Sequence, residues 1–365
     1  MTRHRFKRLV MGIALGMLAM GSAQAQNQLP AKFADDPIAK ALGPQIFNAA
    51  LKEGKVVWYG GTTAEDFLKK GGIDRLNKRF GIKIEPVIGS NDAHATRVAT
   101  EAAVGRVTVD LFDATIPHLF NLHNVGALLK WRPPAPELAK MNPEVFVRDP
   151  ADTIWPTHIS AQALVVNPTL VKAEDEPKSY WDLVDPKWKG KVAMRDPRSA
   201  SGGAWMMMGL AQHPTLGMDY IKKLKDTVDP FTVSGGSGRI RDAIANGQFA
   251  VALGGRGEFI ADLPKGAPIK YVVPKEGLAW TPAGAGILAK GPNPNAAKVA
   301  LTWFYEIEQL QLWTEVARPV AHPDVKVAIP EMSVSAWPLM KQLPMALMAS
   351  PDDFLVEMEK IFGVR

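Results

Sequence analysis

Short apolar runs, small polar turns and amphipathic stretches follow one another in a fixed order along the first third of the chain. The order occurs three times, with strands predicted at 56–59, 82–88 and 109–112 and helices at 64–80, through 98–102 and at 117–124. A further helix at 44–53 precedes them and ends at Gly54. Strand, polar turn and helix in this order predict a parallel sheet with helices on its faces.

The middle third of the chain has the same pattern. Strands are predicted at 191–194, 231–233 and 249–253, and helices at 204–212 and 239–246. Between the two regions, the proline-rich residues 131–157 are predicted to form a surface connection. Strands at 159–166 and 269–273 are predicted to connect the two α/β halves. Ligands bind beyond the carboxyl ends of parallel strands, so the pattern predicts a cleft between the halves.

The amino-terminal segment has the layout of a secretory signal peptide. Basic residues from Arg3 to Arg8 precede an apolar run, 9–20, and Ala23-Gln24-Ala25 offers a cleavage site after Ala25. The run is shorter than the roughly 20 residues that span a bilayer. We therefore expect residues 1–25 to be removed and the mature protein to be periplasmic.

Charge and cysteine content narrow the class of protein further. The chain has 365 residues, 43 of them basic and 37 acidic, and a net charge of +6. Four of the basic residues and none of the acidic ones lie in 1–25, which leaves a mature charge of +2. This small charge does not indicate a nucleic-acid partner. There is no cysteine, which excludes disulfides and a lipid-modified amino-terminal cysteine.

Several blocks of sequence resemble one family. The most specific is 181–192, WDLVDPKWKGKV, followed by Asp196-Pro197-Arg198-Ser199 and Ser201-Gly202. Blocks at 50–59, 80–87, 97–110, 243–251 and 296–311 have matching order and spacing. From about residue 48 to about residue 315, the chain resembles the periplasmic solute-binding proteins of ABC importers, in the branch that includes the ferric-iron binders.

The resemblance implies a fold, a partner and a function. The fold is α/β with two lobes, the type II periplasmic binding protein fold, joined by hinge strands that close on the ligand. Residues 26–160 would form the first part of lobe 1 and 161–272 would form lobe 2. Residues 273–365 would return to lobe 1 and add carboxyl-terminal helices across both lobes. The protein would be a monomeric receptor without catalysis or cofactor, and its partners would be a small-molecule ligand and an ABC transporter membrane permease.

One departure from the resemblance concerns the ligand. Iron binders of this branch carry paired tyrosines just after the strand that corresponds to 249–253, whereas this chain has Gly254-Gly255-Arg256-Gly257-Glu258. Ferric iron prefers anionic oxygen ligands, and an arginine suits an anion instead. The histidine of such sites is also missing near Thr62-Thr63. Arg256 is therefore predicted to clamp a carboxylate, phosphonate or phosphate, although it could simply pair with Glu258 at the surface.

Further ligand contacts are predicted where helices begin after strands. The candidates, besides Arg256, are Thr62, Thr63, Ser90, Asn91, Asp113, Arg195, Ser199, Ser201, Gly202 and Ser237. Hydroxyls and backbone amides at helix starts can bind an anion, but the same residues are ordinary helix caps. Asp113 could bind a ligand amine or cap its own helix. Of Arg195 and Arg198, one could reach the ligand, and the other is predicted to be a solvated or domain-stabilising cation.

Other motifs favour structural roles or leave alternatives open. Met206-Met207-Met208 indicates core packing, and Trp280, predicted in a turn, could stack on a ligand or be structural. The glycine pattern at 284–289 opens no βαβ unit and is better explained as a strand. No metal site is predicted. The alternatives to an anion receptor are a receptor for ferric iron or a polyamine-type cation and, in another class, a cleft hydrolase.

Overall fold

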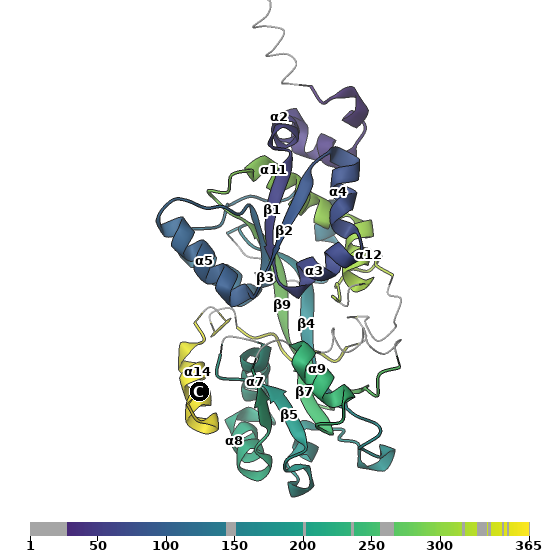
Figure 1. Cartoon of the computed structure of the whole chain (residues 1–365), viewed down its shortest axis with the longest axis vertical. Helices are drawn as coiled ribbons and strands as arrows, with labels where there is room; N and C mark the ends of the chain where they lie inside the picture. The colour runs from purple at the N-terminus through teal and green to yellow at the C-terminus, as the bar shows by residue number, and fades with distance from the viewer. Residues whose placement is uncertain are drawn as a thin grey trace, which may run out of the picture.

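A mixed sheet with helices on both sides runs through the molecule (Figure 1). The computed structural model describes residues 28–143, 151–199, 202–234, 237–255, 266–315, 318–326, 334, 337–344, 347–348 and 350–364. Within these residues, nine strands pair in the order β2-β1-β3-β9-β4-β7-β5-β6, and β8 pairs with β4. The strands are β1 (Lys55–Gly60), β2 (Lys83–Ile88), β3 (Leu111–Thr115), β4 (Trp155–Val166), β5 (Val192–Arg195), β6 (Phe231–Val233), β7 (Val251–Gly255), β8 (Lys270–Val272) and β9 (Ala279–Ile287). The proposed signal segment, 1–25, lies outside the described residues.

A helix follows each strand after which one was predicted, and a further helix at 217–228 was not predicted. They are α2 (Pro37–Glu53), α3 (Thr62–Lys69), α4 (Gly72–Phe80), α5 (Asn91–Ala103), α6 (Ile116–Asn124), α7 (Gly202–Gln212), α8 (Gly217–Val228), α9 (Ser237–Ala245), α11 (Pro294–Phe304), α12 (Ile307–Glu315) and α14 (Asp352–Phe362). Short 3-10 helices occupy Ala31–Phe33, Pro136–Ala139, Ala173–Asp175, Tyr180–Leu183 and Pro186–Trp188. The single helix predicted at 64–80 is two helices, because Gly71 adopts a left-handed conformation (φ +66°) between them.

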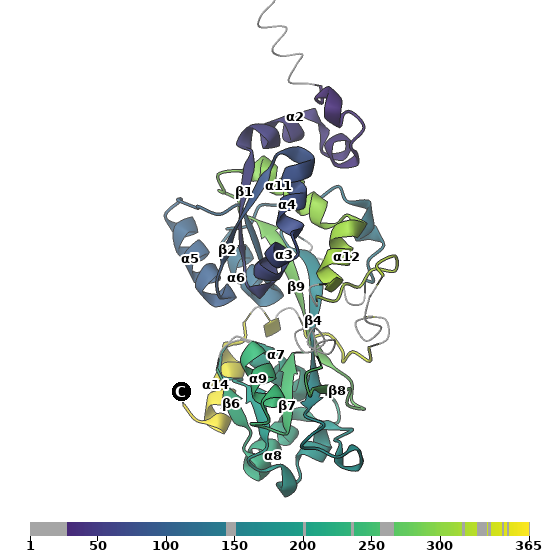
Figure 2. The same ribbon diagram turned by 45° about the vertical axis from the view of Figure 1, so that its right-hand side comes forward.

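The elements form an upper and a lower part (Figures 1 and 2). The upper part contains β1, β2 and β3 with α2 to α6, α11 and α12, whereas the lower part contains β5 to β8 with α7, α8, α9 and α14. β1 is parallel to β2 and β3, and β5 is parallel to β6 and β7. β4 and β9 are antiparallel to each other and run through both parts.

The strand register defines where the two parts meet. The last residue of β3, Thr115, pairs with Ala283 of β9, and the last residue of β7, Gly255, pairs with Gln162 of β4. Between these rows the sheet consists of β4 residues 159–161 paired with β9 residues 280–282. We call these six residues the two-stranded span.

The span corrects two predictions. The second strand that crosses between the parts is β9, not 269–273, since β8 pairs only with Leu164–Val166 at the lower end of β4. Trp280 lies in β9 rather than in a turn, is 4% exposed, and donates from Nε1 to the carbonyl oxygen of Met340 at 2.9 Å. It is therefore a structural tryptophan.

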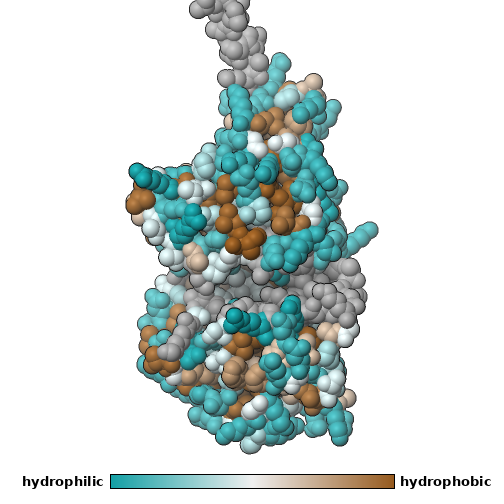
Figure 3. All heavy atoms as spheres, in the orientation of Figure 1, coloured by the Kyte–Doolittle hydropathy of each residue, from teal (hydrophilic) through white to brown (hydrophobic). Residues whose placement is uncertain are grey.

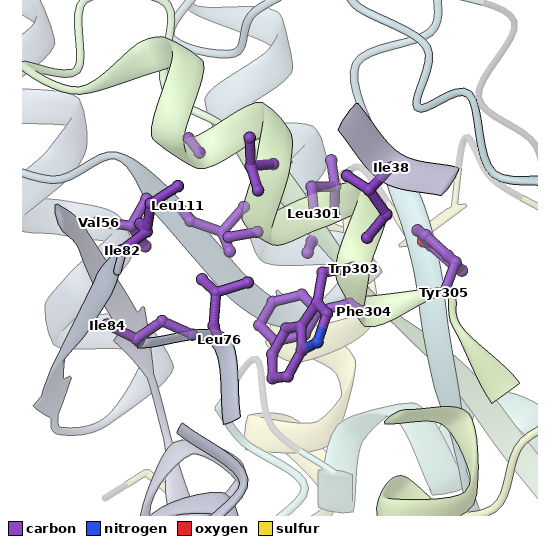
Figure 4. Packing of buried hydrophobic residues seen from close by; sticks show 14 of the residues in the cluster. Ile38, Val56, Leu76, Ile82, Ile84, Leu111, Leu301, Trp303, Phe304 and Tyr305 are labelled. Atoms are coloured by element: carbon purple, nitrogen blue, oxygen red, sulfur yellow. The ribbon is translucent and has the colours of Figure 1, made fainter. Parts of the chain in front are cut away.

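Each part has its own hydrophobic core. In the upper part, α2, α4, α11 and α12 pack on the sheet around Trp58, Phe304 and Trp313. Figure 4 shows part of this core, with Leu76, Leu301 and Phe304 among the labelled residues. In the lower part, α7, α8 and α14 pack on β4, β5 and β7. Met206, Met207 and Met208 are all at most 2% exposed, which confirms the prediction that this run belongs to the core.

Candidate functional site

The carboxyl ends of six strands point to the two-stranded span. β1, β2 and β3 end there from above, and β5, β6 and β7 end there from below, as their parallel registers require. The next helix begins after five of these strands, namely α3, α5 and α6 in the upper part and α7 and α9 in the lower part. Helix starts carry free backbone N–H groups and the positive end of the helix dipole, so this level of the molecule favours negative charge.

In the upper part, the turns after β1 and β2 lie against each other. A Cβ atom at Gly61 would lie 3.2 Å from Asn91 Oδ1, so the glycine lets the asparagine approach the first turn. Asn91 Oδ1 is buried and has no hydrogen-bond partner among the described residues. Ser90 is exposed, and its Oγ accepts from the N–H of Ala93 at 3.2 Å as the cap of α5. The predicted pair Thr62 and Thr63 begins α3. The side chains of these two residues lie outside the described part.

A buried histidine next to these turns was not predicted from the sequence. His94 is 7% exposed and packs against Tyr59 in a tilted arrangement, with ring centroids 4.5 Å apart. Burial lowers the pKa of His94, with a smaller contribution from Arg97, although a hydrogen bond to the Val87 carbonyl opposes the shift. A Cβ atom at Gly89 would lie 2.7 Å from His94 Nε2. The imidazole of His94 therefore lies directly behind the second turn. Its position four residues after the Ser90 cap is the signal that could have indicated it from the sequence.

Asp113 lies inside β3 and not in the turn after it, which corrects the prediction for this residue. Its side chain is 3% exposed and accepts a hydrogen bond from Thr157 Oγ1 at 3.1 Å. Burial raises the pKa of Asp113 to about 7, against the lowering effects of Thr157 and Arg318. The residue at the cap of α6 is Thr115. Asp113 thus does not cap its helix, and its contact with a ligand stays a prediction.

In the lower part, Arg195 and Gly202 lie together. Arg195 is the last residue of β5 and is half-buried, and Gly202 is the first residue of α7. A Cβ atom at Gly202 would lie 2.1 Å from Arg195 Nη1, so only glycine admits the guanidinium against the helix start. Ser199, in the turn between them, is half-buried, whereas Ser201 lies outside the described residues.

The second arginine of this turn has a structural role. Arg198 Nε donates to Asp196 Oδ1 at 2.8 Å, and Nη2 donates to Oδ2 at 3.0 Å. Arg198 Nη1 also donates to the carbonyl oxygen of Gly363 at 3.1 Å, just beyond α14. Arg198 is therefore the domain-stabilising member of the pair, and Arg195 is the remaining candidate for ligand contact.

Two further candidates are only partly described. Ser237 is the first residue of α9, but its side chain lies outside the described part. Arg256 also lies outside the described residues and directly follows Gly255, whose backbone pairs with Gln162 at the lower end of the span. The contact of either side chain with a ligand stays a prediction.

A cluster of possible metal ligands lies away from the strand ends. Among the described residues, Glu137, His322 and Asp324 bring one ligand atom each within 4.8 Å of one another. Lys140 Nζ lies 3.0 Å from Glu137 and 3.1 Å from Asp324, and His322 Nε2 lies 2.9 Å from Glu137. Because Lys140 already pairs with both carboxylates, we interpret the cluster as an ion-pair network that joins two segments of the upper part.

The sequence matches one family over most of its length. The family of bacterial extracellular solute-binding proteins matches residues 72–342. The chain belongs to this family. This solute-binding protein is accordingly a receptor for a solute and not an enzyme. No helix in the described part of the chain has both the length and the apolar character needed to cross a membrane.

Solved structures share its α/β fold at low sequence identity. The periplasmic binding protein AfuA from Actinobacillus pleuropneumoniae, with exogenous fructose-6-phosphate bound, has a TM-score of 0.70 at 19% identity, covering 86% of this chain and 99% of AfuA. Iron-bound HitA from Pseudomonas aeruginosa has a TM-score of 0.68 at 19% identity, covering 85% and 99%. The ferric binding protein from Campylobacter jejuni has a TM-score of 0.67 at 16% identity, covering 85% and 100%. These likenesses confirm the periplasmic binding protein fold.

A sequence relative matches over a shorter region. An uncharacterized protein of Haemophilus influenzae is 29% identical over 141 residues, which is 38% of this chain and 40% of that protein. The match therefore spans about two fifths of the curated relative.

Proposed function

We propose that this protein captures a small organic anion, such as a carboxylate, phosphonate or phosphate ester, between its upper and lower parts and delivers it to an ABC transporter membrane permease. The observation that carries the proposal is the convergence of five helix starts, those of α3, α5, α6, α7 and α9, on the level of the two-stranded span. Each helix start presents roughly +0.5 elementary charge. The upper and lower parts would act as the two lobes, and the periplasmic monomer would exchange ligand by opening and closing.

The described acidic side chains near the strand ends are poorly suited to a cation. Asp196 is 4% exposed and already paired with Arg198 at 2.8 Å. Asp113 is buried, and burial raises its pKa to about 7, which reduces its negative charge at neutral pH. A polyamine would therefore meet positive helix ends and Arg195 without an available carboxylate among these described groups.

The tyrosines of the chain argue against a phenolate-bound ferric ion. All five lie among the described residues, and four of them, Tyr59, Tyr180, Tyr220 and Tyr305, are at most 2% exposed. Burial raises the pKa of Tyr180, Tyr220 and Tyr305, which disfavours their phenolate forms. The fifth, Tyr271, lies in β8, which pairs with the lower end of β4. No tyrosine thus lies in a turn at a strand end, in contrast to what iron ligation would need.

The solved structures of similar fold include one with iron and one with a phosphorylated sugar. HitA was solved with iron and AfuA with fructose-6-phosphate. The helix starts, the Arg195–Gly202 contact and the buried tyrosines favour an anion of the second kind over iron.

A thermal-shift panel tests the proposal. Purified protein would be incubated with inorganic phosphate, phosphate esters, phosphonates and carboxylates, and separately with ferric citrate and spermidine. A true ligand at 100 times its Kd should add about 2.7 kcal/mol of stability. We expect stabilisation by one class of organic anion and no turnover of it. Stabilisation by spermidine or by ferric iron alone, with no response to any organic anion, would contradict the proposal.

Calorimetry of an arginine variant tests the predicted clamp. Losing one charged hydrogen bond to a buried ligand costs about 2–5 kcal/mol, so Arg256→Ala should weaken anion binding more than tenfold. The matched control is Arg132→Ala, since Arg132 is exposed and pairs with Asp152 at 2.8 Å, away from the strand ends. Equal affinity in the parent and Arg256→Ala would place Arg256 outside the site.

A further inference from the structure

A groove lies between the upper and lower parts. Its volume is about 390 Å³, and its walls come from α5 and α6 above and from α7 and the segment around Met348 and Pro351 below. The outline of the molecule is indented at this level in the orientation of Figure 3. We call this space the lateral groove. Its volume falls in the range typical of small-molecule sites, about 300–1,000 Å³.

The lateral groove adjoins the helix starts on which the anion proposal depends. Pro117 and His118 lie in the first turn of α6, and Trp205 is the fourth residue of α7. Ala95 and Thr96 follow the start of α5 by four and five residues, which corresponds to about 6–8 Å along the helix axis. A ligand whose charged group meets these helix starts can therefore extend its remaining atoms into the groove.

The groove presents hydrogen-bonding groups without formal charge. None of its described lining residues is Asp, Glu, Lys or Arg. Thr96, Thr100 and Asn121 supply exposed hydroxyl and amide groups. His118, whose Nδ1 lies 2.8 Å from Thr115 Oγ1, also lines the groove, and the other walls are mainly alanine, proline, leucine and methionine side chains. This mixture suits an uncharged, hydroxyl-bearing part of a molecule, because hydroxyls both donate and accept hydrogen bonds.

One buried donor in the groove wall has no acceptor among the residues that the structure describes. Trp205 is 2% exposed, lines the groove, and its Nε1 has no hydrogen-bond partner among the described residues. A buried N–H group without a partner is costly and uncommon in native proteins. The indoles of Trp155, Trp188 and Trp280 donate to backbone carbonyl oxygens. Two other indoles, Trp58 and Trp313 of the upper core, also have no partner among the described residues, but neither lines the groove. Of the three indoles without a partner among the described residues, Trp205 is the one that lines the groove, so its N–H is the donor available to a ligand oxygen there.

We infer that the lateral groove is a specificity subsite, which binds the uncharged, hydroxyl-bearing part of the organic anion. Trp205 Nε1 donates to a ligand oxygen, and Asn121 and Thr96 bind further hydroxyls from the opposite wall. The inference rests on the proposed capture of an organic anion at the helix starts. It assigns selectivity among anions to the groove and charge recognition to the strand ends.

The test compares a minimal anion with a larger one. Inorganic phosphate carries the charge alone, and a hexose 6-phosphate carries the same charge with a hydroxylated body. Trp205→Phe keeps the aromatic ring and removes the N–H, and Ala99→Leu narrows the groove without changing its charge. The matched control is Trp188→Phe, which removes an N–H that donates to the Asp182 carbonyl oxygen at 2.9 Å in the lower core.

Calorimetry should separate the two probes. We expect Trp205→Phe to weaken binding of the hexose phosphate about three- to tenfold and to leave the affinity for inorganic phosphate unchanged. Ala99→Leu should have the same selective effect by steric exclusion. Trp188→Phe should lower the melting temperature without changing the ratio of the two affinities.

Two results would overturn the inference in distinguishable ways. In the first, both probes bind the parent, and Trp205→Phe either weakens the binding of both equally or weakens the binding of neither. Trp205 then does not contact the hydroxylated body of the ligand, and the subsite is wrong. If the parent binds neither these probes nor any other organic anion, the proposed function fails and the subsite fails with it.

Discussion

Asp113 should make the stability of the protein depend on pH in a direction unusual for a carboxylate. Its side chain is buried in β3, and burial raises its pKa from 3.8 to about 7 in the folded protein. The folded state therefore holds the proton over a pH range in which the unfolded state has released it. The stabilising contribution is fully present below about pH 4 and is lost as the pH rises through 7.

The size of the stability change follows from the shift in the pKa of Asp113. A difference of this size corresponds to roughly 4 kcal/mol in total, and between pH 5 and pH 8 the loss is roughly 2.5 kcal/mol. The neighbouring His158 acts in the opposite direction, because burial lowers its pKa well below 6.5, with a further lowering by Arg318. Its contribution is lost as the pH falls below 6.5, so the two residues partly compensate in the parent protein.

The variant Asp113→Asn separates the two effects. It removes the titration of Asp113 and retains His158 and Arg318, so the His158 contribution largely cancels in the comparison. We expect the free energy of unfolding of the parent to fall by roughly 2.5 kcal/mol more than that of Asp113→Asn between pH 5 and pH 8. Urea denaturation at intervals of half a pH unit measures this difference.

A control and a refuting result complete the design. Asp226→Asn changes an exposed carboxyl group on α8 and should leave the shape of the pH profile unchanged. Parallel profiles for the parent and Asp113→Asn would mean that Asp113 does not titrate between pH 5 and pH 8. The argument from burial would then be wrong.

Two further predictions follow from the strand ends and the span. Gly202→Ala should displace Arg195, because the new Cβ would lie 2.1 Å from Nη1, and should weaken binding of an organic anion more than tenfold by calorimetry; unchanged affinity would place Arg195 outside the site. Binding should also close the upper and lower parts by bending β4 and β9, so the bound protein should have a smaller radius of gyration in small-angle scattering. An unchanged radius would indicate a pocket that is already closed.

The order of strands and helices was readable from the sequence because it depends on local periodicity. Apolar runs such as 56–59 and the small polar residues after them mark strands and helix starts, and the structure has them at these positions. β9 was harder to recognise as a crossing strand, because its sequence is AWTPAGAGI and contains Pro282, Gly284 and Gly286. These residues disfavour a strand by propensity. A Cβ at Gly284 would lie 2.8 Å from the Trp155 carbonyl oxygen, so close packing against β4 requires the glycine.

The candidate site was predictable in its location but not in its contacts. Small polar residues after strands indicated helix starts, and Ser90 is indeed a cap. The choice between Arg195 and Arg198 depended on which one Asp196 holds, and that pairing is a matter of three-dimensional geometry. Asp113 was misplaced for the same reason. A polar residue at the end of an apolar run looks like a turn, although here Thr157, from a distant strand, provides its hydrogen bond inside the sheet.

The contacts of Thr157 with Asp113 and His158 affect how the two-stranded span can bend. The register of β4 shifts between Pro156 and His158, directly above the span, where Thr157 donates to Asp113 and lies 3.0 Å from His158 Nδ1. At the upper end of the span the N–H of Ile159 also donates to the Pro319 carbonyl oxygen at 3.0 Å. These contacts hold the upper end of β4 to β3 and to a second segment of the chain.

The lower end of the span is held by packing. A Cβ at Gly209 of α7 would lie 2.9 Å from Ala279 Cβ, so this helix packs closely on β9 where the lower part begins. Trp280 in turn is bonded to the Met340 carbonyl oxygen and packs with Trp337. With both ends fixed in this way, the proposed closure must bend β4 and β9 within the three paired rows between them. The segment around 337–340 must then move together with β9, because the Trp280 hydrogen bond would otherwise break in a buried environment.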